Sequence, residues 1–329
     1  MKLSRIIFVA ISMLGMAITG CQSSGPIKNR PSSTRIACDE TFENIIAQEI
    51  DVFEFSYANR RRMAAIVPSY VSQSAAFDSL LNPDCPINTV VAGRKLTKAE
   101  RTRLSNQKKR PREEQIAVDG IAIIANTAND IPELSIPDLE KILTGEYTNW
   151  EQVWPASRLD TIRVLFDQNG SSLMQYMKEN IMHDKTFGPN VYAQGSSPDV
   201  FEGVMRRRGA IGVIGVSWIS SDMNGRTFSP DEIRQMSTQS DTTRLSFSEK
   251  IRVMPIFNEY EARAYKPYQE YLFDGRYPLH RPIYMITTMT AHTVAGAFYS
   301  FVTSTQGQKV ILLTGVLPAR VTPRVVNLE

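Results

Sequence analysis

The sequence has few of the residues that build metal centres, disulfide frameworks or catalytic groups. Of 329 residues, only three are Cys and three are His. The histidines, His183, His280 and His292, are scattered, and no Cys or His pair has the spacing of metal ligands. No Ser-His-Asp order and no glycine-rich phosphate loop is present. We therefore expect no metal site, no resident cofactor and no enzymatic activity.

An excess of either charge is also missing. The chain has 37 Lys and Arg against 34 Asp and Glu, a formal net charge of +3. Loss of the first 20 residues, which contain Lys2 and Arg5, would lower this charge to +1. Such a balance argues against a nucleic-acid-binding protein. The 42% hydrophobic content is enough for one large core or, more typically for this length, two.

The first 20 residues are typical of a targeting sequence. Lys2 and Arg5 precede an apolar stretch, 6–16, that is too short to cross a bilayer comfortably. Ile18-Thr19-Gly20-Cys21 resembles a lipobox, which predicts removal of residues 1–20 and lipidation of Cys21. The alternative is an ordinary secretory signal that ends by chance at a Cys.

Residues 21–33 contain Ser, Gly and Pro with almost no apolar side chain, so we expect a lipidated Cys21 followed by a flexible tether. No acidic residue follows Cys21 directly, which favours a periplasm-facing, membrane-anchored lipoprotein of the cell envelope. We also expect a monomer. Cys38 and Cys85 fall at opposite ends of two predicted parallel strands, beyond disulfide reach, and are predicted to be free thiols.

The mature chain alternates strand and helix signals, which predicts an α/β fold with a parallel sheet. Strands are predicted at 35–38, 65–70 (strand or loop), 87–92, 116–126, 162–166, 210–216, 251–257 and 282–287. Helices are predicted to begin near Glu40, Ser74, Thr97, Ser135, Ser171 or Ser172, Ser197, Val294 and Gln306. The runs 116–126 and 282–287 are predicted to cross between two lobes, with 34–120 plus 282–329 in lobe 1 and 121–281 in lobe 2.

Six segments occur in an order that points to one family. IAVDGIAIIANTAND, SIPDLEKILTGEYTNW, a strand with a Ser-rich turn, GAIGVIGV, YPLHRPIYMITT and STQGQKVILLTGVLPA follow one another along the mature chain. This order resembles the phosphate-binding (PstS-like) substrate-binding proteins of ABC importers. The resemblance implies a type II periplasmic-binding clamshell with two crossover strands. It also implies a solute-binding protein that delivers phosphate or a related oxyanion to an ABC permease.

The resemblance points to two strand-to-helix turns as the anion site. Thr41-Phe42 matches a hydroxyl-plus-amide pair of the family, and Ser171-Ser172 matches its anion loop. Helix N-termini supply oriented N–H groups and a partial positive charge, which suit an oxyanion. The alternative is that both serines cap their helix and have no further role, since Ser is an ordinary N-cap residue. Ser72 and Ser74 fall where the family has another hydroxyl ligand.

The turns also depart from the family in charge. Asp167 stands four residues before Ser171, where the family places an Arg, and a carboxylate repels a dianion. Asp39 and Glu40 add two more carboxylates at the first turn. Arg94 could contact the oxyanion in bidentate fashion, or it could neutralise Asp167. The alternative function is therefore a non-transport sensor or envelope interaction module that has lost tight phosphate binding.

Other conspicuous features have simpler interpretations. The basic stretch from Lys98 to Arg112 is expected to be a solvated helix and loop, the alternative being a surface for an anionic headgroup. The aromatic residues between Tyr260 and Phe273 are expected to pack as a helix on the second lobe, the alternative being a carbohydrate platform. Asp119, inside a predicted crossing strand, is expected to be a hydrogen-bonded structural residue.

Overall fold

The computed structural model describes residues 32–58, 63–220 and 250–320. The predicted leader 1–20, Cys21 and most of the tether therefore lie outside the described residues. No helix among those that are described has the length and apolar character needed to cross a membrane.

The first part of the main sheet is built around β1 (Ser32–Asp39), which pairs in parallel with β2 (Ala64–Val71) and β3 (Thr89–Ala92). Residues Ile36 to Asp39 are buried, as expected for a central strand of a parallel sheet. The connections are a single 3-10 turn, η1 (Glu40–Phe42), and the helices α1 (Glu43–Ala58), α2 (Gln73–Leu81) and α3 (Lys98–Asn106).

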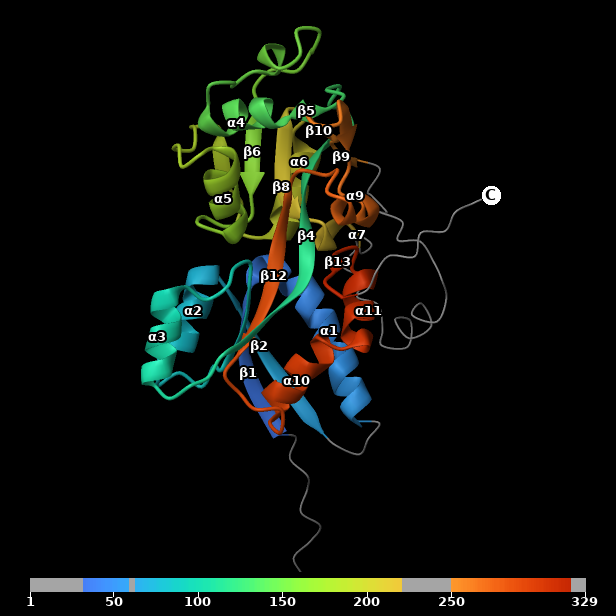
Figure 1. The fold of residues 1–329 in the computed structure, drawn as a ribbon. Coiled ribbons are helices and arrows are strands. Elements are labelled where there is room, and N and C mark those ends of the chain that lie inside the picture. The colour runs from blue at the N-terminus through green and yellow to red at the C-terminus, as the bar shows by residue number, and fades with distance from the viewer. Residues whose placement is uncertain (1–31, 59–62, 221–249, 321–329) are drawn as a thin grey trace, which may run out of the picture. The chain divides into compact units, whose positions relative to one another are not determined.

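Two long strands join this part of the sheet to the next. β12 (His280–Thr287) runs antiparallel to β4 (Arg112–Asn126), from the pair His280 and Gly120 to the pair Thr287 and Arg112. From Ile121 onward β4 pairs instead with β8 (Ala210–Gly215). Figure 1 shows β4 and β12 side by side as the only strands drawn through both parts of the described sheet. The strand partner of β4 therefore changes between Gly120 and Ile121.

The second part of the sheet contains β8, β6 (Arg163–Phe166), β7 (Val191–Ala193) and β9 (Ile251–Val253). A separate three-stranded sheet is formed by β11 (Arg263–Tyr265), β10 (Ile256–Asn258) and β5 (Leu134–Ser135). The helical segments of this region are α4 (Ile136–Thr144), η2 (Trp150–Gln152), α5 (Ser172–Tyr176) with a following π turn η3 (Met177–Ile181), α6 (Ser197–Arg206), α7 (Ser217–Ser220) and α9 (Gln269–Phe273).

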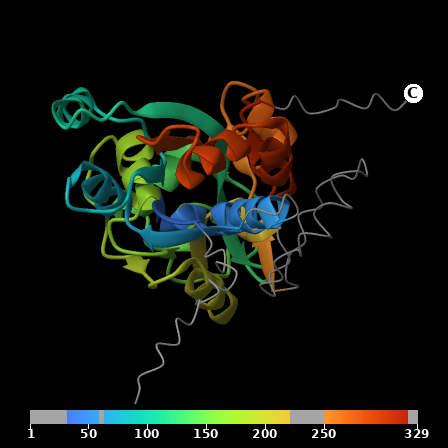
Figure 2. The same ribbon diagram turned by 90° about the horizontal axis from the view of Figure 1, so that it is seen from below.

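The chain then returns to the first part of the sheet. Helices α10 (Val294–Val302) and α11 (Thr305–Leu313) pack beside α1, as seen from below in Figure 2. β13 (Leu317–Pro318) pairs with β4 at Val118 and Ala117. N-terminal and C-terminal segments thus share one region of the fold.

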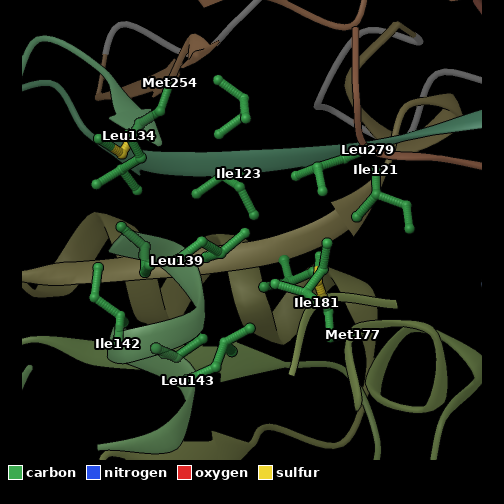
Figure 3. Close-up of a cluster of buried hydrophobic side chains, with 14 of the residues drawn as sticks. Ile121, Ile123, Leu134, Leu139, Ile142, Leu143, Met177, Ile181, Met254 and Leu279 are labelled. Carbon is green, nitrogen blue, oxygen red and sulfur yellow. The ribbon is translucent and has the colours of Figure 1, made fainter. Parts of the chain in front are cut away.

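Each part of the sheet has its own apolar core. One cluster, drawn in Figure 3, packs Leu139, Ile142 and Leu143 of α4 and Met177 of η3 against Ile123 of β4. Another packs α1 and α10 against β1 and β12, with the Phe53 and Phe298 rings 5.2 Å apart. These separate cores agree with the composition, and the predicted α/β class is confirmed.

Most helix starts follow the predicted caps, because the capping residues are encoded locally. Thr97 and Ser135 both form capping boxes, and α4 ends at Gly145, whose φ of 79° is left-handed. The single strand predicted at 251–257 was wrong, since it divides into β9 and β10 around Met254 and Pro255. Cys38 and Cys85 are free thiols, as predicted.

The aromatic segment is also more broken than the predicted helix. Tyr265 lies in β11, and only Tyr271 and Phe273 of the aromatic residues belong to the short helix α9. Tyr271 packs against both Tyr265 and Tyr268, so three of these rings form one aromatic cluster.

Candidate functional site

The crossing strands carry a buried ion pair. Arg281 on β12 stands directly opposite Asp119 on β4, next to the point where β4 changes partner. Nε and Nη2 of Arg281 donate to Oδ2 of Asp119 at 3.2 and 3.1 Å. Only 3% of the Arg281 side chain and 1% of the Asp119 side chain are exposed. Asp119 also accepts the N–H of Val216, which confirms its expected hydrogen-bonded role.

The rest of the guanidinium faces the two predicted anion turns. Nη2 of Arg281 donates to Oγ1 of Thr41 at 2.9 Å, and Nη1 donates to Oγ of Ser172 at 2.6 Å. The two hydroxyl oxygens lie 3.2 Å from each other. We call these four residues, Thr41, Asp119, Ser172 and Arg281, the junction. Residues 131 positions apart in the sequence meet here, so the structure brings the two predicted turns together.

The first turn is held by its own carboxylate. Asp39 caps η1, and its Oδ1 accepts from the backbone N–H of Thr41 at 3.1 Å and lies 3.0 Å from the Thr41 hydroxyl. The carboxylate of Asp39 therefore occupies part of the helix N-terminus where the sequence predicted an anionic ligand. The ring centre of Phe42 lies 4.4 Å from the guanidinium carbon of Arg281.

The second turn divides its two serines between the expected roles. Ser171 is the N-cap of α5, and its Oγ accepts from the N–H of Met174 at 3.3 Å. Ser172 makes the contacts with Thr41 and Arg281 instead. The capping interpretation is thus correct for Ser171 alone.

Further contacts join the same elements. The Trp218 indole N–H donates to the carbonyl oxygen of Thr41 at 3.3 Å, from α7 to η1. The amide of Gln73, at the start of α2, donates to Oε1 of Gln175 in α5 at 3.3 Å. Residues from both parts of the sheet therefore contact one another directly beside the junction as well as within it.

The carboxylates of Asp39, Glu40 and Asp167 lie near the junction. Asp39 and Asp167 are 1% and 2% exposed. Within the described residues, Oδ2 of Asp39, Oε1 of Glu40 and both oxygens of Asp167 have no hydrogen-bond partner. Such groups are costly to bury in the charged form.

The pKa values reflect this burial. Burial, followed by the charges of Asp167, Asp39 and Glu43, raises the pKa of Glu40 to about 7. Burial also raises the pKa of Asp167, although nearby Ser171, the Gln168 backbone and Arg281 act against the rise. Burial likewise raises the pKa of Asp119, and the charge of Arg281 opposes this rise.

Arg94 and Ser74 do not join the junction. Both terminal nitrogens of Arg94 donate to Glu100 at 2.9 Å, and its guanidinium lies 3.7 Å from the centre of the Phe77 ring. The hypothesis that Arg94 neutralises Asp167 is therefore wrong, because the guanidinium pairs with Glu100, six residues further along the chain. Ser74 is exposed, and its hydroxyl lies 3.2 Å from that of Ser72.

Arg281 is a site residue that was not predicted from the sequence. The residue lies in YPLHRPIYMITT, one of the six segments that carry the family resemblance. A usable signal existed: the two predicted crossing runs contain or adjoin one acidic and one basic residue, and buried charges are normally paired. Sequence alone did not give the β4 to β12 register that places Asp119 opposite Arg281.

The chemistry of the junction is that of binding. It offers one fixed guanidinium and two hydroxyl groups, which suit recognition of a small polar ligand. Across the described ranges, no group of three or more His, Cys, Asp and Glu side chains is arranged to hold a metal ion.

Comparison with known proteins agrees with this fold. Residues 26–306 match the PBP superfamily domain. Phosphate-binding protein PstS of Staphylococcus haemolyticus is 20% identical over 279 residues, which cover 83% of this chain and 78% of that protein.

Solved structures give the same picture. A putative phosphate ABC transporter substrate-binding protein from Clostridium perfringens, solved with bound phosphate, has a TM-score of 0.65 at 18% identity and covers 88% of this chain and 100% of that one. An ABC-type phosphate transport receptor from Vibrio cholerae has a TM-score of 0.59 at 20% identity, with 87% and 100% coverage. The predicted periplasmic-binding fold is confirmed. Since the superfamily match covers most of its length, the chain belongs to the PBP superfamily.

Proposed function

We propose that this protein is an extracytoplasmic solute-binding protein of an ABC importer, and that its ligand is phosphate or a related oxyanion bound at the junction. The observation that carries the proposal is the bridge made by Arg281 to one hydroxyl from each turn, Thr41 and Ser172. Arginine with hydroxyl donors is a common set for oxyanion recognition. The relatives named above are phosphate-binding proteins, which supports the ligand class.

The proposal includes two lobes that meet at the junction, 34–120 plus 282–329 and 121–281. The change of strand partner after Gly120 supports this division. It also includes attachment to the membrane through a lipidated Cys21, facing the periplasm, and delivery of ligand to a permease.

One observation favours the alternative, a sensor or envelope interaction module on the same fold. The hydroxyls of Thr41 and Ser172 contact each other directly, and Asp119 already offsets the charge of Arg281. A dianion would also meet Asp167, whose buried carboxylate has no hydrogen-bond partner among the described residues.

Titration calorimetry separates the two functions. The full chain in detergent is titrated with phosphate, sulfate and nitrate at equal ionic strength. Saturable phosphate binding supports the transport receptor. No heat from any of the three anions, with the protein shown to be folded by circular dichroism, contradicts it and favours the interaction module.

A further inference from the structure

We propose that Arg281 is the residue that recognises the anion at the junction and that Asp119 is the residue that positions it. This inference rests on the function proposed above. It assigns anion recognition to a residue on a crossing strand, and not to Arg94 or to the position of Asp167.

The first step is the fixed orientation of the guanidinium. Asp119 binds Nε and Nη2, which leaves the Nη1 and Nη2 edge directed at the two turns. An arginine has five N–H groups, and the bonds to Asp119, Thr41 and Ser172 use four. The fifth is on Nη1, the nitrogen that already faces Ser172.

The second step is the direction of the hydroxyl protons. A guanidinium only donates, so the Thr41 and Ser172 oxygens must accept from it, and their own O–H groups point elsewhere. The Thr41 hydroxyl has Asp39 Oδ1 at 3.0 Å as an acceptor. Within the described residues, the acceptor for the Ser172 proton is Oγ1 of Thr41 at 3.2 Å.

The ligand class follows from these two donors. In a small oxyanion, one oxygen can replace Thr41 Oγ1 as the acceptor from Ser172 while a second oxygen accepts the remaining N–H of Arg281 Nη1. Two oxygens are needed because the two N–H groups of Nη1 diverge, and one of them is already directed at Oγ of Ser172. A cation or a neutral apolar ligand would leave the remaining N–H of Arg281 without an acceptor.

A purely structural role for Arg281 is the competing explanation. In that explanation the arginine only neutralises Asp119, which is fully buried opposite it on β4. Replacing Arg281 alone cannot distinguish the roles, because the variant leaves Asp119 charged and unpaired. The double replacement Asp119→Asn with Arg281→Gln removes both charges together and keeps side chains that can hydrogen-bond.

The test is calorimetric titration of the full chain with inorganic phosphate. Wild type, Arg281→Gln, the double variant and the control Arg206→Gln are compared, with folding checked by thermal melting. Arg206 is an exposed cation that pairs with Glu202 on α6, so its replacement is expected to leave affinity unchanged. We expect the double variant to fold and to bind phosphate about 10-fold to 100-fold more weakly than wild type. This factor corresponds to the loss of one or two charge-assisted hydrogen bonds.

The outcomes separate this inference from the function on which it rests. If the double variant folds and binds phosphate as tightly as wild type, the assignment of Arg281 is overturned while the receptor function stands. If folded wild type binds none of phosphate, sulfate and nitrate, the proposed function and the inference both fail. Weak binding by the double variant together with wild-type binding by Arg206→Gln supports the assignment.

Discussion

Ser171 and Ser172 are adjacent in the chain, but their hydroxyls serve different parts of the molecule. Ser171 accepts a hydrogen bond from Met174 and begins α5, whereas Ser172 contacts Thr41 and Arg281 from the other part of the sheet. This division makes the two serines a matched pair of sites for mutation. One reports on helix capping and the other on the junction.

We expect Ser171→Ala to lower the free energy of unfolding by about 1 kcal/mol, the usual cost of losing an N-cap. Ser172→Ala should cost about 1–3 kcal/mol, because it leaves a buried N–H of Arg281 without its acceptor. Urea denaturation of both variants measures the difference. Phosphate affinity should fall for Ser172→Ala and stay near wild type for Ser171→Ala. Equal effects of the two substitutions on affinity would contradict the division.

The Asp119 and Arg281 pair should show strong coupling in stability. Either single replacement leaves one buried charge alone, and we expect Arg281→Gln or Asp119→Asn to cost about 3–5 kcal/mol each. The double variant should cost much less than the sum, because no unpaired charge remains. Urea denaturation of the four proteins gives the coupling energy. Additive losses would show that the two side chains do not interact in solution.

Glu40 should make stability depend on pH near neutrality. Its pKa is raised to about 7, so the folded protein keeps a proton that the unfolded chain releases at lower pH. Stability should therefore fall as pH rises from about 4.5 to about 7, where the folded protein must ionise this half-buried group. Glu40→Gln should flatten that part of the profile, whereas replacement of the exposed Glu133 by Gln should leave it unchanged. A profile that Glu40→Gln does not alter would contradict the raised pKa.

Asp167 should oppose anion binding, and more so at high pH. Burial raises the pKa of this carboxyl, and a bound anion would raise it further. Phosphate affinity should therefore increase as pH falls, and Asp167→Asn should strengthen binding and weaken its pH dependence. Calorimetry at several pH values provides the test. The same pH profile for wild type and Asp167→Asn would remove Asp167 from the site.

The sequence predicted best what is determined locally. Capping residues Thr97, Ser135 and Ser171 begin helices where expected, because a cap depends on a few neighbouring residues. Side-chain contacts of the charged residues were harder to predict from the sequence than these local caps. Arg94 had two predicted partners, the oxyanion and Asp167, but both of its terminal nitrogens donate to Glu100, which is only six residues away in the sequence.

The junction itself could be predicted only in part. The family resemblance indicated Thr41 and the 171–172 turn, which do meet. Arg281 could not be assigned, because its position depends on the register between β4 and β12 and on the bulge between Ile283 and Tyr284. A shift by one residue would turn a strand side chain to the opposite face of the sheet.

The cysteines allow a direct test of lipidation. Cys38 is fully buried, its S–H donates to the carbonyl oxygen of Asp39, and burial raises the pKa of its thiol well above the usual value. Cys85 is partly exposed. A thiol reagent should therefore label Cys85 first in the native protein and reach Cys38 only on unfolding.

The number of thiols in the unfolded mature protein then reports on Cys21. We expect two reactive thiols, Cys38 and Cys85, if the Cys21 sulfur carries lipid. Cys85→Ser should remove the fast signal and leave one thiol after unfolding. A third thiol in mature protein purified from membranes would contradict lipidation of Cys21. If neither Cys38 nor Cys85 reacts without reductant and both react after reduction, the two residues form a disulfide. Such a bond would require the start of β3 to move toward the end of β1.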